Sequence, residues 1–211
     1  MRITQSELEK LDKVTKLNIV NSISGIKPGN LIGTKSKAGI ENLAIFSSVV
    51  HLGSDPPLLG FILRPHHEFR RDTYANIIET GYFTINHIPT HMTEKAHFTS
   101  AKFEAEESEF EKCKIEPYYS DSFFAPYVKE SGVKIGLKYV ESIPITINDT
   151  AMIIGEVVEI DILDKAVSED GRVDLQIANS AGVSGLNMYY KLEKVGEYPF
   201  ARLRELPNFD K

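Results

Sequence analysis

In one stretch of the chain, apolar segments alternate closely with glycine, proline and polar turn residues. It reads GIENLAIFSS (39–48), SDPPLLGFILRP (54–65), RRDT (70–73) and GYFTIN (81–86). Its two apolar segments, 42–50 and 58–63, are predicted strands. Between them, Asp55-Pro56-Pro57 breaks the pattern, because proline donates no backbone hydrogen bond. We expect these two strands to be adjacent and the rest of the chain to complete a barrel around them.

A helix and a third strand follow in the same stretch. Asp72 or Thr73 can cap a helix over 74–80, and Gly81 can end that helix in a left-handed conformation. The next segment, 82–88, is predicted to be a strand that ends at a proline.

The remaining chain adds strands and short helices. Alternating apolar residues predict a strand over 133–139, and a long strand is expected over 151–163 after a turn at Asn148-Asp149. Ser6 and Glu9 have capping-box spacing and predict a helix over 6–16. Further expected elements are strands at 31–34, 186–192 and 195–200, a helix at 91–98, and a short helix from a second capping box at Ser108 and Glu111.

This pattern of many short strands and few helices indicates a fold class that is mainly β, a Greek-key-like antiparallel barrel. We expect one domain over residues 1–211, with an acidic excursion at about 99–121. The simplest interpretation of the excursion is a solvated loop, and the alternative is a lid over a site.

Composition narrows the function classes. The chain has 211 residues with a net charge of −6, which argues against a nucleic-acid partner because phosphate backbones require a basic face. No apolar run is long enough to span a membrane, and no signal peptide is evident. The single cysteine, Cys113, fits a reducing compartment, so we expect a cytoplasmic protein.

One cluster of donors suits a phosphate monoester. Guanidinium groups, hydroxyls and the backbone N–H groups of a helix start all bind phosphate. The stretch contains such groups at Ser47, Ser48, Arg64, Arg70, Arg71 and Thr73. The alternative is that the arginines are surface charges and Thr73 only caps its helix.

The strand at 42–48 offers a second half of the site. A flat heterocycle can lie along a strand edge, where Ala44 and Ile45 are compact enough to allow its approach and Phe46 gives apolar cover. The alternative is a plain core strand.

Several ordered motifs carry a resemblance. They are Asn42-x-Ala44-x-Phe46-Ser47, Asp55-Pro56-Pro57-Leu58-x-Gly60-Phe61, Arg64-Pro65, Arg71-Asp72-Thr73-x-x-Asn76-Ile77 and Gly81-x-Phe83-x-x-Asn86. Together they resemble the flavin reductase-like family of FMN-binding split barrels, over about residues 25–200.

The resemblance implies a homodimer of split β-barrels with FMN near the interface. It implies a flavin ring against the strand at 44–48 and a phosphate held by groups of the donor cluster. The full set of expected cofactor-binding residues is Asn42, Ala44, Ile45, Phe46, Ser47, Ser48, Leu63, Arg64, Arg71, Asp72, Thr73, Asn86 and His91.

The hypothesis for function is an FMN-dependent oxidoreductase. It would pass reducing equivalents from NAD(P)H to an acceptor such as free flavin, ferric iron or oxygen. The alternatives are an FMN-carrying redox partner or sensor without turnover, and a ligand-free barrel that acts as an interaction module. No catalytic acid or base is identified. We expect no metal, because Pro89 would break a helix joining His87 and His91.

Overall fold

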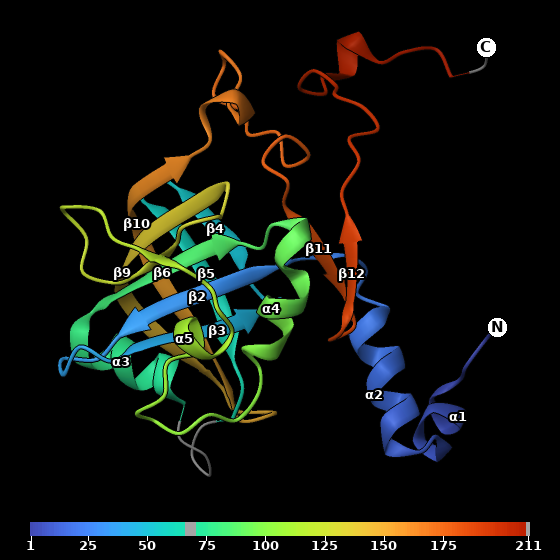
Figure 1. Ribbon diagram of the computed structural model, residues 1–211. Coiled ribbons are helices and arrows are strands. Elements are labelled where there is room, and N and C mark those ends of the chain that lie inside the picture. Colours follow the sequence, from blue (N-terminus) through green and yellow to red (C-terminus); the bar gives the residue numbers. More distant parts are fainter. Residues whose placement is uncertain (66–70, 210–211) are drawn as a thin grey trace.

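The computed structural model describes residues 1–65 and 71–209. Its centre is a seven-stranded sheet in which all neighbouring strands are antiparallel (Figure 1). In spatial order the strands are β3 (Glu41–Phe46), β2 (Asn30–Lys35), β6 (Tyr82–His87), β9 (Val133–Ile145), β10 (Thr150–Ile162), β5 (Pro57–Leu63) and β4 (Val50–Ser54). The predicted mainly β, antiparallel architecture is confirmed.

The first two predicted strands are not adjacent. The expected strand at 42–50 is broken after Phe46, so that β3 and β4 lie on opposite edges of the sheet. The Ser48 hydroxyl explains the break, because it accepts from Ile62 N at 3.1 Å and lies 3.3 Å from Ile62 O, to which it donates. The side chain takes the place of a strand ladder here and ties the crossing chain to β5.

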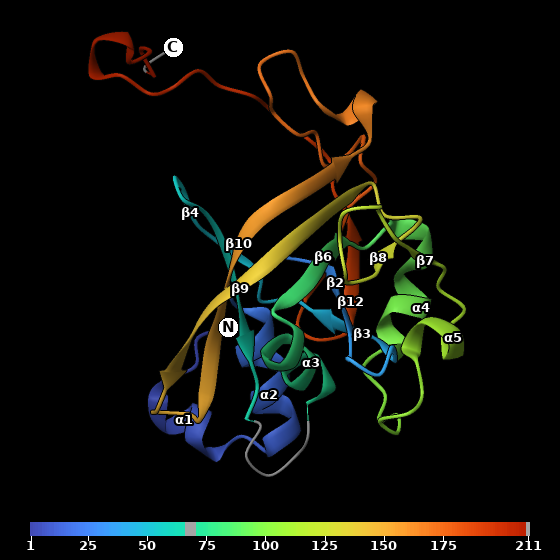
Figure 2. The same cartoon turned by 90° about the vertical axis from the view of Figure 1, so that its left-hand side faces the viewer.

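β9 and β10 form a long hairpin that spans the molecule (Figure 2). Asp149 has a left-handed φ of 57° in its turn, as predicted there, whereas β9 extends well beyond the expected end at 139. Two register shifts bend the pair, one of them at Gly155. A Cβ on Gly155 would lie 2.6 Å from Phe83 Cζ, so only glycine lets β10 pack this closely over the core.

Two smaller sheets complete the strands: β1 (Lys27–Pro28), β11 (Ala181–Ser184) and β12 (Met188–Lys191) form one, and β7 (Pro117–Tyr118) with β8 (Tyr127–Val128) forms the other. β11 was not predicted from the sequence, because its four residues are too few to show a period. The strand predicted at 195–200 is wrong, since no described strand pairs with this segment.

The helices are short: α1 (Gln5–Lys10), α2 (Lys13–Ser22), α3 (Asp72–Thr80), α4 (Thr93–Phe98) and α5 (Glu109–Lys112), with single turns η1 (Thr90–Met92), η2 (Asp164–Ala166) and η3 (Leu203–Glu205). In the described part of the chain, no helix combines the length and the apolar character needed to cross a membrane.

The single helix predicted at 6–16 is in fact two helices. The Asp12 carboxylate accepts from Val14 N and Thr15 N, both at 3.0 Å, and so caps a new helix where the first was expected to continue. The first capping box is displaced as well, because Thr4 N, not Ser6 N, donates to a glutamate three residues on.

Helix α3 ends at Gly81 with a φ of 79°, as predicted. The prediction that Asp72 or Thr73 occupies its cap position is wrong, because Arg71 holds that position without a side-chain bond. Thr73 lies inside the first turn, and its hydroxyl faces β3 instead.

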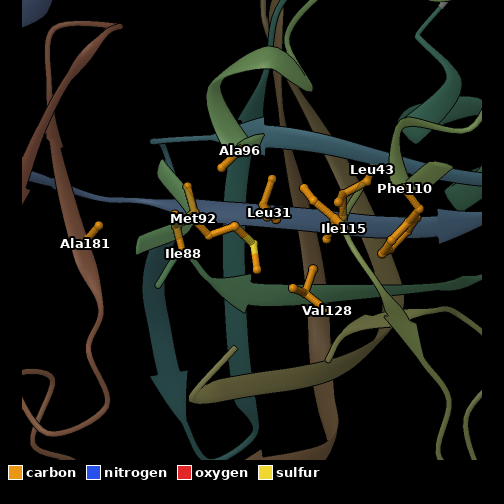
Figure 3. Packing of buried hydrophobic residues seen from close by; sticks show 9 residues of the cluster. All are labelled: Leu31, Leu43, Ile88, Met92, Ala96, Phe110, Ile115, Val128 and Ala181. Atoms are coloured by element: carbon orange, nitrogen blue, oxygen red, sulfur yellow. The ribbon is translucent and has the colours of Figure 1, made fainter. Parts of the chain in front are cut away.

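Two apolar clusters hold the sheet. Inside the barrel, Phe61 packs edge-on against Phe46 and Phe83, with ring centroids 4.9 and 5.8 Å apart. The second cluster lies between β2, β3 and the short helices, and includes Phe110 and Ile115 (Figure 3). Since these two residues belong to the acidic excursion and are buried, the excursion is anchored in the core rather than wholly solvated.

Asn86 ties three elements together and provides a test of the fold. Its side chain is fully buried, donates to Leu31 O and Thr84 Oγ1, and accepts from Val128 N. We expect Asn86→Ala to lower the free energy of unfolding by about 3 kcal/mol, because it leaves buried polar groups without partners. Urea denaturation measures this loss. Asn187→Ala, at an exposed turn, is the control, and equal effects at both sites would contradict the assignment.

Candidate functional site

A buried polar network joins the two halves of the predicted site. Asn42 Nδ2 on β3 donates to Thr73 Oγ1 in the first turn of α3 at 3.0 Å. The same amide lies 3.2 Å from Thr34 Oγ1 on β2, which also accepts from Asn76 Nδ2 at 3.1 Å. All four side chains are buried. The start of α3 is therefore fixed directly against β3.

Two exposed arginines lie near this junction. Arg64 follows the end of β5, and Arg71 precedes α3 with its Nε and Nη2 3.4 Å from Pro65 O. Among residues 1–65 and 71–209, neither guanidinium forms an ion pair. Arg70, the third predicted arginine, lies outside the described residues. Two guanidinium groups beside a helix start can bind a phosphate.

β3 is an edge strand, so one of its sides lacks a ladder partner. Leu43 N on this side donates to Glu109 Oε2 of α5 at 2.9 Å. Antiparallel pairing alternates along a strand, so the backbone groups of Ile45 point to the same side. Ala44, Ile45 and Phe46 are only half-buried. This edge can offer backbone hydrogen bonds to a planar group.

The two serines after β3 differ in whether their hydroxyl groups are already hydrogen-bonded. The hydroxyl of Ser48 is occupied by its bonds to β5, whereas Ser47 is half-buried at the end of the strand. Ser47 is therefore the better placed of the two to meet a ligand.

Three predicted residues lie in other surroundings. The Asn86 amide is used within the fold, and the Leu63 side chain is buried in the inner cluster, where it fixes the start of the Arg64 segment. His91 is exposed on η1, with Nε2 2.9 Å from Glu130 Oε2. The structure brings Asn42, Arg71, Asp72 and Thr73 together. The side chains of Asn86, Leu63 and His91 do not join this group.

An acidic cavity of about 240 Å³ opens at the junction. Asn42 and Asp72 contribute to its wall, and its other carboxylates are Glu79, Glu104, Glu106, Glu107 and Glu109. An anionic phosphate would be repelled from such a wall. A phosphate at the junction would instead be attracted by the guanidinium groups of Arg64 and Arg71.

Glu109 is a residue that the sequence did not single out. The pattern around it suggested a capping box, but Ser108 forms no side-chain cap, and its hydroxyl has no partner in the described chain. Glu109 instead reaches β3. Burial raises the pKa of the Glu109 carboxyl, and the charge of Asp72 adds to the rise.

The described histidines belong to no cluster of metal ligands. Within the ranges that the structure covers, no group of three potential ligands comes together. His87 is half-buried with Nδ1 3.0 Å from Ser180 Oγ, and desolvation lowers its pKa to about 4. It is therefore a neutral structural histidine at physiological pH.

Glu109 allows a test that separates charge from hydrogen bonding. A raised folded-state pKa means that this group favours folding when protonated and that the contribution is lost as pH rises through the folded pKa. Glu109→Gln keeps an acceptor for Leu43 N, so it should be more stable than the wild type at neutral pH, and this advantage should vanish at acidic pH.

Glu109→Ala removes the acceptor and should lose about 1–3 kcal/mol at both pH values. Urea denaturation of the three proteins measures these differences. If Glu109→Gln were as unstable as Glu109→Ala at neutral pH, the ionised carboxylate itself would be required at Leu43 N.

The chain resembles known proteins in both sequence and fold. The flavin reductase like domain family matches residues 26–180. A crystal structure of a putative flavin reductase with split barrel domain from Shewanella frigidimarina is 43% identical, with a TM-score of 0.90, covering 95% of this chain and 100% of that one.

Two more distant structures share the fold. Nitrilotriacetate monooxygenase component B from Bacillus cereus is 22% identical with a TM-score of 0.81, covering 94% of this chain and 98% of that one. An FMN-binding protein from Thermus thermophilus is 16% identical with a TM-score of 0.67, covering 83% and 91%. The family match spans most of the chain and confirms the resemblance: this protein belongs to the flavin reductase like domain family.

Proposed function

We propose that the protein is an FMN-dependent oxidoreductase that uses NAD(P)H to reduce an acceptor such as free flavin, ferric iron or oxygen. The observation that carries the proposal is the 3.0 Å bond between Asn42 and Thr73. It holds the edge of β3 against the helix start that follows Arg71, so a mononucleotide could meet both. Family membership and the FMN-binding protein of the same fold support this choice of cofactor.

The donor set fits each part of FMN. Arg64, Arg71 and the first turn of α3 would hold the phosphate, with Ser47 as a further hydroxyl donor. The backbone of Ile45 would hydrogen-bond the ring, with the half-buried Ala44 and Phe46 beside it. When bound, FMN supplies the redox chemistry, and the protein supplies binding and orientation.

The charge around the junction would orient the cofactor. The acidic wall formed by Asp72, Glu79 and the excursion repels the phosphate, whereas the arginine side attracts it. Only one direction along β3 therefore satisfies both ends of the molecule. We further propose a homodimer, as the family resemblance implies.

Absorbance spectroscopy tests the oxidoreductase. The purified protein, or the protein after addition of FMN, should show a bound flavin, and anaerobic NADH or NADPH should bleach it rapidly. Slow bleaching by both nicotinamides would support a redox partner or sensor instead. If the protein took up no FMN at all, a ligand-free barrel that acts as an interaction module would be the remaining hypothesis.

Arg71→Ala tests the phosphate side of the site. Losing one charge-assisted contact should weaken FMN binding about tenfold or more, with no change for riboflavin, which lacks the phosphate. Fluorescence titration of both flavins measures this. Arg2→Ala, at an exposed arginine before α1, is the control and should change neither. Equal losses for FMN and riboflavin would contradict a phosphate contact.

A further inference from the structure

The C-terminal segment after β12 exposes an unusual amount of apolar surface. We call residues 193–209 the arm. Its large apolar side chains are 65–96% exposed, namely Val195, Tyr198, Phe200, Leu203, Leu206 and Phe209. Single exposed apolar residues are ordinary, but six in one short segment mark an interaction surface.

The base of the arm is fixed to the body. Arg172 pairs with Glu197, Lys194 Nζ lies 3.5 Å from Asp174 Oδ2, and Lys194 N donates to Gln176 Oε1 at 3.0 Å. Beyond this base the arm runs outward, away from the barrel, in both views (Figures 1 and 2). The exposed side chains are therefore held away from the chain's own core.

A second apolar surface lies at the other end of the chain. Helix α2 buries none of its residues, and its Val14, Leu17 and Val20 are exposed, as is Ile23 directly after it. We call these four residues the α2 face. The helix also has no charged residue in its second half, so this face lacks the polar cover typical of a solvated helix.

The positions of the two surfaces suit a symmetric pair. In both views the arm leaves the barrel at the top and α1–α2 at the bottom, on the same side of the molecule (Figures 1 and 2). A two-fold axis placed beside that side, perpendicular to the outward direction and to the line from the arm to α2, exchanges top and bottom and sets a second copy against that side. It brings the arm of one copy to the α2 face of the other, twice.

We propose that the arm crosses to a second copy of this chain and packs on the α2 face of that copy. The arm and the α2 face both lie outside residues 26–180, so the contact is formed by segments that flank the family domain. It does not depend on the flavin and goes beyond the proposed reaction.

The area is sufficient for a stable pair. An aromatic side chain buries roughly 150–250 Å², and the arm has three aromatic residues besides Val195, Leu203 and Leu206. Stable interfaces bury about 800 Å² on each partner. Two reciprocal contacts between arm and α2 face reach this value, so the second copy accounts for the exposed surface.

Photo-crosslinking identifies the chain and the segment that cover the arm. Phe200 is replaced by the photoreactive benzoylphenylalanine in the full-length protein, and isotope-labelled and unlabelled chains are mixed before irradiation. Mass spectrometry should find crosslinks between chains that join position 200 to residues 13–26. The control carries the same group at Phe98 on α4, which is 58% exposed, and should give none of these crosslinks. Crosslinks within one chain only, or none above the control, would overturn the proposal.

Sedimentation equilibrium supplies an independent measurement. The double variant Phe200→Ser and Leu203→Ser should raise the dissociation constant of the dimer at least about tenfold. Val14→Ser with Leu17→Ser should do the same, and combining all four changes should add little, because both sets remove one contact. Phe98→Ser is the control. A monomeric wild type, or an unchanged constant in both double variants, would refute the arm contact. Flavin binding, measured separately, reports only on the proposed function.

Discussion

The hydrogen bond between Asn42 and Thr73 is the constraint on which the rest of the site depends. It belongs to a network in which Thr34 accepts from two amides, and all its members are buried between β2, β3 and α3. Buried amides and hydroxyls are costly without partners, so the network accepts only one position of the helix on the strand. The arginine before α3 and the free edge of β3 are consequently held in a fixed relation.

Charge then distinguishes the two sides of this junction. Arg64 and Arg71 form no ion pair within the described chain, whereas the cavity at the junction is lined with carboxylates. Glu109 belongs to the acidic side but serves the strand, since its carboxylate takes the Leu43 N–H that a ladder partner would otherwise take. The excursion that appeared to be a solvated loop thus completes the edge of the sheet, and Phe110 secures it in the core.

Local patterns predicted the regular elements well and their pairing less well. Alternation gave the strands at 133–139 and 151–163, and Gly81 gave the end of α3, because these signals lie within one segment. The break after Phe46 depends on a Ser48 contact with β5 that is formed only in the folded chain. For the same reason the roles of Glu109 and Asn86 could not be predicted from local sequence, since their partners lie far along the chain. The donor cluster was identified from residue types, and Thr73 and Asn42 do meet.

The features available to a ligand all lie where the sheet fails to satisfy its own backbone. β3 has a free edge, the chain leaves the ladder at Ser47, β5 ends before Arg64, and α3 starts beside them. A continuous ladder would leave no N–H groups for a cofactor, because each would already have a partner. The split between β3 and β4 therefore does more than shape the barrel. Within the described chain, it leaves the edge of β3 close to the arginine before α3, and the buried network keeps them in this relation.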